Sequence, residues 1–293
     1  MQIGSNGLTL EAEIHGPPTA TPILMIMGLG MQLTAWPAEL LGALAASGLR
    51  PIVFDNRDVG LASKFDAWGR PNLFKVSMQY ALGLPIRAPY LLADMARDAL
   101  GLLDALGIER AHLVGVSMGG MIAQLLSVLA PSRVAALTLI MTTTGSRRLP
   151  GPTLAARRAL LSRPRGRDEQ ALIAHGMRVW RAIGSPAYPA NDATLRAKVE
   201  RSVRRAWHPQ GLTRQLVAVT ASGERSRLVE RITQPTLVVH GRDDPLVPAA
   251  CGIDLAARIP GARLELIEGM GHDMPLELIP SLAAQIIAHC DGK

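Results

Sequence analysis

AHLVGVSMGGMIAQLLSVLA, the stretch at residues 111–130, decides the fold. Residues 111–116 form a short, mainly apolar run without polar alternation, which is typical of a strand buried on both faces of a parallel sheet. Residues 118–130 are nearly all apolar, which predicts a central helix that is covered on most sides. Ser117 lies between the two patterns. The stretch therefore predicts a strand, a sharp turn and a helix in direct succession.

Strand and helix patterns alternate on both sides of this stretch. Residues 91–106 place apolar side chains at helical spacing with acids on the opposite side, and Gly107 ends that helix. Leu8–His15 resembles an antiparallel opening strand, and the alternating residues Arg263–Leu266 suit an edge strand. The remaining apolar runs predict buried strands at Ile23–Met27, Ile52–Phe54, Val134–Met141 and Thr236–His240. The alternation predicts an α/β fold with a mostly parallel, doubly wound sheet.

The alternation stops in one long segment. From Gly145 to Arg231 there are only helix patterns, which prolines interrupt, and the strand pattern resumes at Thr236. We expect a helical cap inserted after the sixth strand, over the ends of the strands. Residues 1–144 and 232–293 would then form the core domain, and residues 145–231 the cap.

Composition excludes a disordered chain and a small disulfide-rich scaffold, and the distribution of charge bears on a nucleic-acid partner. The chain has 293 residues, of which 48% are apolar, and its two cysteines cannot build a disulfide framework. Its net charge is +7, and the segment 145–231 holds 18 basic against 6 acidic residues. Such an excess can mark a nucleic-acid partner. The few aromatic residues there do not interleave with the arginines as a stacking platform would, so we expect a solvated basic surface and no nucleic acid.

The N-terminal sequence bears on location. The apolar stretch Ile23–Met31 is too short to span a bilayer, and residues 1–20 carry Glu11 and Glu13 but no basic region typical of a secretory signal. We therefore expect a cytoplasmic protein without stable membrane insertion, with a homodimer left open.

The sequence Gly115-Val116-Ser117-Met118-Gly119 has the composition of a nucleophile elbow. Such a turn is so sharp that small residues are needed two positions before and after the serine, where Gly115 and Gly119 stand. The turn would expose the Ser117 hydroxyl at a helix N-terminus, where partial positive charge favours a developing anion.

A serine needs a base, and the base needs an orienting acid. Among seven histidines, His272 lies in a glycine-flanked loop after the last strand pattern, where an open sheet keeps its site. The acid is expected between Ser117 and His272 in the chain. Two neighbours compete in the loop after Thr236–His240: Asp244, which precedes Pro245 and so has an extended backbone, and Asp243 as the alternative.

An oxyanion hole needs two backbone donors. One is expected to be the N–H of Met118, which follows the nucleophile. The other is assigned to the N–H of Leu29, because Gly28 and Gly30 let that loop approach without obstruction. The loop lacks the third glycine of a dinucleotide fingerprint, and zinc-type spacings are absent from the sequence, so no cofactor and no metal are expected.

Taken together, these residues resemble the α/β-hydrolase fold family from about Leu8 to Ala288. Residues 55–63 are similar to the family's D-x-R-x-x-G-x-S loop, in which Asp55 and Arg57 would be structural. The pairs Met27-Gly28 and Trp36-Pro37 and the Gly-Met-Gly-His sequence at 269–272 look most like the aclacinomycin methylesterase-like esterases.

The resemblance implies a serine carboxylesterase that cleaves esters of small to medium apolar substrates through an acyl-enzyme, without a cofactor. The same triad would also serve a lactonase, a perhydrolase or a carbon–carbon bond hydrolase. The alternative from another class is a ligand-binding protein that keeps the fold without catalysis.

Overall fold

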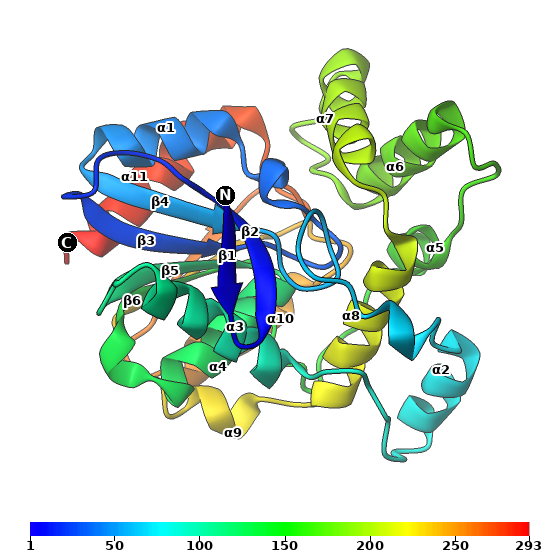
Figure 1. Cartoon of the computed structure of the whole chain (residues 1–293), viewed down its shortest axis with the longest axis horizontal. Coiled ribbons are helices and arrows are strands. Elements are labelled where there is room, and N and C mark those ends of the chain that lie inside the picture. The colour runs from blue at the N-terminus through cyan, green and yellow to red at the C-terminus, as the bar shows by residue number, and fades with distance from the viewer. Residues whose placement is uncertain (293) are drawn as a thin grey trace.

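A computed structural model describes residues 1–292 and contains one eight-stranded sheet (Figure 1). The strand order is β1-β2-β4-β3-β5-β6-β7-β8. The strands from β3 onward run parallel, and β1 and β2 are antiparallel to their neighbours. This arrangement confirms the expected α/β class. The bounds are β1 Gln2–Ser5, β2 Leu8–Ile14, β3 Thr21–Ile26, β4 Leu49–Phe54, β5 Ala111–Val116, β6 Val134–Ile140, β7 Thr236–Gly241 and β8 Arg263–Ile267.

The sequence prediction overlooked the first strand. β1 pairs with β2 in a hairpin whose two turn residues, Asn6 and Gly7, both have positive φ. This is the conformation that an Asn-Gly pair adopts between two antiparallel strands. With β1 included, the helical insertion follows the sixth strand, as expected, and β8 is an edge strand.

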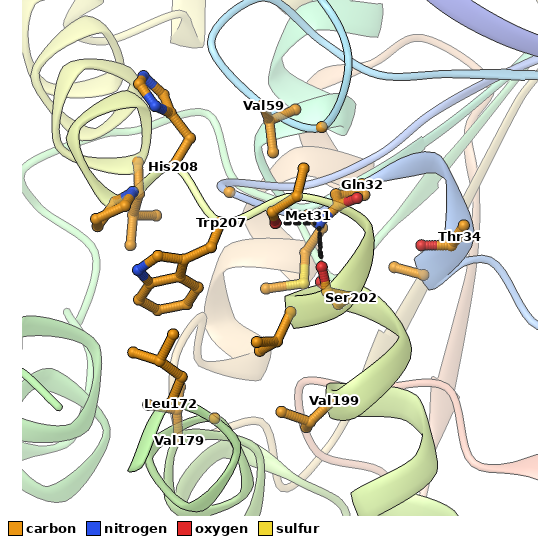
Figure 2. Close-up of a pocket in the computed structure, with 18 of the residues that line it drawn as sticks. Met31, Gln32, Thr34, Val59, Leu172, Val179, Val199, Ser202, Trp207 and His208 are labelled. Atoms are coloured by element: carbon orange, nitrogen blue, oxygen red, sulfur yellow. Dashed lines mark hydrogen bonds between the residues drawn. The ribbon is translucent and has the colours of Figure 1, made fainter. Parts of the chain in front are cut away.

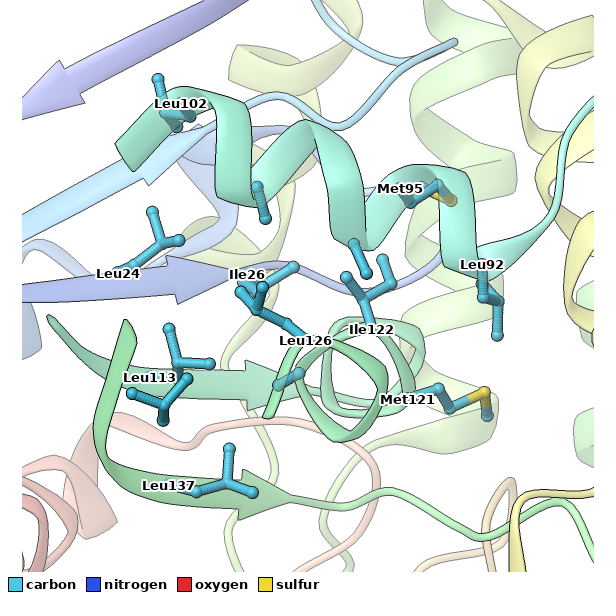
Figure 3. Packing of buried hydrophobic residues seen from close by; sticks show 14 of the residues in the cluster. Leu24, Ile26, Leu92, Met95, Leu102, Leu113, Met121, Ile122, Leu126 and Leu137 are labelled. Atoms are coloured by element: carbon cyan, nitrogen blue, oxygen red, sulfur yellow. The ribbon is translucent and has the colours of Figure 1, made fainter. Parts of the chain in front are cut away.

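Helices cover both faces of the sheet. On one face lie α1 (Ala38–Ala46) and α11 (Ile279–Cys290), which contact each other. The other face carries α3 (Leu92–Ala105), α4 (Met118–Leu129) and α10 (Ala249–Arg258). Figure 3 shows Ile122 and Leu126 of α4 between α3 and the strands. The helix α4 is therefore held from several sides, and its N-terminus is a fixed support for a site.

A helical layer lies beyond one end of the sheet. It consists mainly of the insertion between β6 and β7, with α9 returning to pack on α4. The sequence prediction had no helix in residues 64–90, but α2 lies there and contacts α8. The bounds are α2 Leu73–Ala81, α5 Leu154–Leu161, α6 Glu169–Ile183, α7 Asp192–Arg205, α8 Pro209–Ser222 and α9 Ser226–Val229. The one-turn 3₁₀ helices are Leu33–Ala35, Asp66–Trp68, Pro131–Arg133 and Leu276–Leu278.

Buried carboxylates after β4 tie this layer to the sheet. Asp55 is fully buried and accepts hydrogen bonds from two backbone N–H groups and, at 2.7 Å, from the guanidinium of Arg205 in α7. Asp58 makes two 2.8 Å hydrogen bonds with Arg214 of α8, and both side chains are buried. Arg57 pairs with the buried Asp98 of α3. The bonds of Asp55 and Asp58 fix α7 and α8 to the loop at the carboxyl end of β4, and the bond of Arg57 fixes the same loop to α3.

No helix within residues 1–292 is both long enough and apolar enough to cross a membrane.

Candidate active site

Ser117 occupies a strained turn between β5 and α4. Its φ is 54° and its ψ is −118°, a backbone conformation that residues other than glycine rarely adopt. The backbone is pinned on both sides, because the Ser117 N–H donates to the Ile140 carbonyl at 3.0 Å and the Thr142 hydroxyl donates to the Ser117 carbonyl at 2.7 Å. Ser117 is thereby held at the carboxyl end of β5.

The two flanking glycines are required by close packing. A Cβ atom at Gly119 would lie 2.0 Å from the Ile26 carbonyl oxygen, and one at Gly115 would lie 2.5 Å from the Gly119 oxygen. Both distances are shorter than any normal contact, and the atoms met are backbone that cannot move aside. The packing of α4 against β3 and β5 thus gives the physical reason for the small residues in this turn.

His272 connects the serine to a carboxylate. Its Nε2 lies 3.1 Å from the Ser117 Oγ, and its Nδ1 lies 2.7 Å from Asp244 Oδ2. A carboxylate oxygen accepts, so Nδ1 carries the proton, and Nε2 of the neutral ring is left to accept from the serine hydroxyl. The histidine and the aspartate are buried, and the His272 N–H donates to the Ile183 carbonyl of α6 at 2.7 Å.

The two neighbouring aspartates make different contacts. Besides His272, Asp244 accepts the N–H groups of Leu246 and Val247 through Oδ1, each at 2.8 Å. Asp243 points elsewhere and accepts the Gly269 N–H at 2.8 Å. Asp243 therefore fastens the loop that carries His272, whereas Asp244 touches the imidazole itself.

A second histidine lies close to the Asp244 carboxylate. His240 at the end of β7 is fully buried, and its Nε2 donates to the Val247 carbonyl at 2.7 Å while lying 3.6 Å from Asp244 Oδ2. Burial lowers the pKa of His240, which favours the neutral ring. From the sequence, His240 lies at the end of a predicted strand with no part in the site, so this proximity was missed. The signal was its position four residues before Asp244, across one loop.

The loop after β3 lies against the serine. A Cβ atom at Gly28 would be 3.3 Å from the Ser117 Cβ, so only a small residue fits there without displacement. The Gly30 N–H donates to Gln215 of α8 at 2.8 Å. Within residues 1–292, the N–H groups of Leu29 and Met118 have no hydrogen-bond partner and are available as donors.

Two cavities are lined by chain neighbours of the site residues, although Ser117, Asp244 and His272 line neither of them. The first, of about 160 Å³, lies between the loop after β3 and helices α6 to α8. Figure 2 shows Met31 and Gln32 on one side of it and Leu172 and Trp207 on the other. Its lining is mostly apolar, and it includes Gly30, the neighbour of Leu29 in the chain.

The second cavity, of about 460 Å³, is lined by parts of α1, α6 and α7 and by the loop after His272. Asp273 lines it, and Ser117 lines neither cavity. The walls of both cavities include Thr34, Ala35, Trp180 and Lys198. The two cavities therefore share this part of their walls.

Lys198 brings an amine to the shared wall. Its Nζ lies 3.7 Å from the centre of the Trp180 ring. Burial lowers the pKa of this amine to about 8, and the nearby Asp273 opposes the shift. The pKa of Asp273 is in turn raised by burial, and its carboxylate accepts a hydrogen bond from Ser185. Among residues 1–292, no three His, Cys, Asp or Glu side chains gather as a metal-binding group.

Comparison with known proteins places the chain in a family. Residues 21–277 match the model of the alpha/beta hydrolase fold. A rhodomycin D methylesterase of Streptomyces sp. (strain C5) is 32% identical, with 98% of this chain and 96% of the relative covered. A 2-hydroxy-6-oxononadienedioate/2-hydroxy-6-oxononatrienedioate hydrolase of Cupriavidus pinatubonensis is 35% identical, with 89% of this chain and 85% of the relative covered.

A solved structure agrees with the fold. The enol-lactonase from Burkholderia xenovorans LB400 has a TM-score of 0.77 and 23% identity, with 99% of this chain and 100% of that chain covered. The family expected from residues 55–63 and from the Gly-Met-Gly-His sequence is confirmed. The chain belongs to the α/β-hydrolase fold family.

Proposed function

We propose that the protein is a serine carboxylesterase in which Ser117 is the nucleophile, His272 the general base and Asp244 the orienting acid. One observation carries the proposal, the pair of hydrogen-bond distances of 3.1 Å and 2.7 Å that links the three side chains through the imidazole. The similarity to a protein named as a methylesterase supports the ester as the bond that is cleaved.

The chemistry follows from the protonation of the imidazole. Ser117 Oγ attacks the ester carbonyl carbon while His272 Nε2 takes its proton, and Asp244 stabilises the imidazolium. The negative oxygen that forms would accept hydrogen bonds from the N–H groups of Leu29 and Met118. Collapse breaks the carbon–oxygen bond, and the alcohol leaves with the proton from His272.

The acyl group then remains on Ser117 until water removes it. His272 takes a proton from the water as it attacks the acyl carbon, and the carboxylic acid departs as the serine regains its proton. No step needs a cofactor or a metal ion. The elbow and loop glycines Gly28, Gly115 and Gly119 give the reacting atoms their space.

The first cavity favours a small-molecule ester with an apolar substituent. Its mainly apolar wall suits an acyl or alcohol group of small to medium size, whereas the second cavity also carries charged residues such as Lys198, Arg201 and Asp273. We place the reaction in the cytoplasm and residues 145–231 in a cap domain over the site. Residues of that range, from helices α6 to α8 and the loops that join them, make up more than half of the lining of each cavity.

The second candidate is a carbon–carbon bond hydrolase, which the 35% identity to a 2-hydroxy-6-oxononadienedioate hydrolase favours. The same serine, histidine and aspartate would serve it. Activity on a vinylogous diketo acid together with no activity on simple esters would select this candidate over the esterase.

A panel of p-nitrophenyl esters from acetate to palmitate tests the esterase. We expect the highest rates on short and medium chains, and Ser117→Ala should lower kcat to background. A matched pair tests the acid: Asp244→Asn should lower kcat by about 10³–10⁴-fold because it disturbs the imidazole tautomer, whereas Asp243→Asn should stay within about ten-fold. Equal rates for Ser117→Ala and the wild type, or a larger loss for Asp243→Asn, would contradict these assignments.

A further inference from the structure

Exposed apolar side chains are concentrated in one segment that contributes no residue to the site, residues 61–91. Of the fifteen large apolar side chains exposed within residues 1–292, eight belong to this segment, and α2 contains no buried residue. Phe74 is 76% exposed and Leu82 is 67% exposed. A concentration of exposed apolar groups in one segment favours an interaction surface, whereas singly scattered ones need no explanation. The eight are Leu61, Trp68, Phe74, Met78, Tyr80, Leu82, Leu84 and Leu91.

The segment stands out from the body of the molecule. In Figure 1, α2 lies beside α8, on the side of α8 away from the sheet. Val59 and Gly60, which directly precede the segment, line the first cavity. The apolar surface therefore lies on the same side of the molecule as the inserted helices and close to the space proposed for substrate.

Apart from the paired Asp66, the charges of this segment are positive. Arg70, Lys75 and Arg87 are exposed, and the guanidinium of Arg87 lies 5.1 Å from the centre of the Trp68 ring. Arg147 joins from the loop after β6, with its guanidinium 4.6 Å from the centre of the Tyr80 ring. We call these four cations and the eight apolar residues the α2 surface.

The α2 surface lacks a free acid. The one acidic residue in 61–91 is Asp66, whose carboxylate is paired with Arg214 and His208. The cations of this surface are therefore not neutralised from within the segment. A partner would have to supply negative charge as well as an apolar contact.

We propose that the α2 surface docks the protein peripherally on a bilayer that contains anionic phospholipid. Aromatic side chains with a polar tip favour the interface between headgroups and acyl chains, and leucine and phenylalanine side chains bury themselves just below it. Lysine and arginine near the surface add attraction to anionic headgroups. The helix would lie on the membrane without crossing it.

The charge argues against a second copy of the chain as the occupant. A two-fold dimer places the same patch on both subunits. Facing α2 surfaces would bring Lys75, Arg87 and Arg147 of both subunits together without an opposing carboxylate. Anionic lipid instead satisfies the apolar and the cationic groups at once.

Vesicle flotation with the full chain tests this docking directly. The probes are vesicles of phosphatidylcholine alone and of phosphatidylcholine with 30% phosphatidylglycerol. We expect binding to the anionic vesicles that weakens with added salt. Phe74→Ser/Leu82→Ser should lower the partition coefficient by about ten-fold or more. Lys75→Gln/Arg87→Gln should lower it by about 25-fold, from about five-fold per cation.

The control is Leu129→Ser/Ile253→Ser, which removes two exposed apolar side chains, 48% and 45% exposed, from α4 and α10. It should bind like the wild type, and all variants should keep the esterase rate on p-nitrophenyl acetate, so lipid binding and ester hydrolysis can fail separately. No binding of the wild type to anionic vesicles would overturn the docking, as would equal losses in the control. A dimer in sedimentation velocity that Phe74→Ser/Leu82→Ser dissociates would show that the occupant is a second copy.

Discussion

At the scale of single residues, neighbouring aspartates show how side-chain direction separates roles that sequence leaves open. Asp243 and Asp244 follow the same strand, and the reasoning from Pro245 favoured the second without excluding the first. The structure has Asp244 on the imidazole and Asp243 on the Gly269 N–H. The backbone direction after β7 decides which carboxylate faces which loop. That direction depends on the packing of the two loops, which no local pattern encodes.

Lys198 carries a prediction about substrate charge. Because the pKa of its amine is lowered to about 8, the ammonium is charged below that pH and loses its charge as the pH rises through it. A half-ester with a free carboxylate should therefore gain from Lys198 at pH 6.5 but not at pH 9.5. The wall of the second cavity also carries Asp273 and Arg201, which the substitution of Lys198 leaves unchanged.

The measurement compares kcat/KM for monomethyl adipate and methyl hexanoate. Lys198→Met should lower the ratio of the two values by about five-fold at pH 6.5 and by less than two-fold at pH 9.5. Lys75→Met, the same change at an exposed position outside both cavities, should leave the ratio unchanged. If Lys198→Met leaves the ratio unchanged at both pH values, the amine takes no part in substrate recognition.

At the scale of elements, one buried ion pair joins α8 to the loop after β4. Burial alone would raise the pKa of Asp58, but hydrogen bonds from Arg214, the Phe65 N–H and Tyr90 lower it overall. Asp58→Asn would leave the fully buried Arg214 without its main counter-charge. We expect a loss of about 3–5 kcal/mol in the free energy of unfolding at pH 7.

Urea denaturation at several pH values checks this prediction. The lowered pKa means that Asp58 contributes its full stability above pH 3.8 and loses it as the pH falls through the folded-state pKa. The gap between wild type and Asp58→Asn should therefore narrow below about pH 4. Asp192→Asn removes an 80% exposed partner of Arg181 and should cost less than about 1 kcal/mol. Similar losses for both variants would contradict the role given to the buried pair.

At the scale of the whole molecule, the sequence predicts elements that have a regular hydrophobic pattern. It does not predict how segments that are distant in the chain pack against one another. The strand at Ala111–Val116 has the bounds that its apolar run predicts, and the helix beginning at Met118 ends one residue early. β1 was missed although Asn6-Gly7 signals a hairpin turn, because four residues are too few to show alternation. The helix α2 was missed because its apolar residues face solvent instead of a core.

The basic excess of residues 145–231 illustrates the same limit. The sequence suggested a solvated arginine-rich surface, yet Arg214 is fully buried and Arg225 is 4% exposed. Arg225 binds backbone carbonyls at Gly223 and Thr143, and burial lowers its pKa to about 10. Part of the positive charge therefore holds the inserted helices in place. Only the folded arrangement tells such arginines from the exposed ones.

The most direct measurement of the central claim is the mass of the intact protein after treatment with a small organophosphate. An activated serine attacks phosphorus and keeps one phosphoryl group, so we predict one adduct per chain, located on Ser117 by peptide mapping, with esterase activity lost in proportion. His272→Ala should slow the labelling by at least about 100-fold. An adduct at another residue, or labelling of Ser117 at the same rate without His272, would contradict the account.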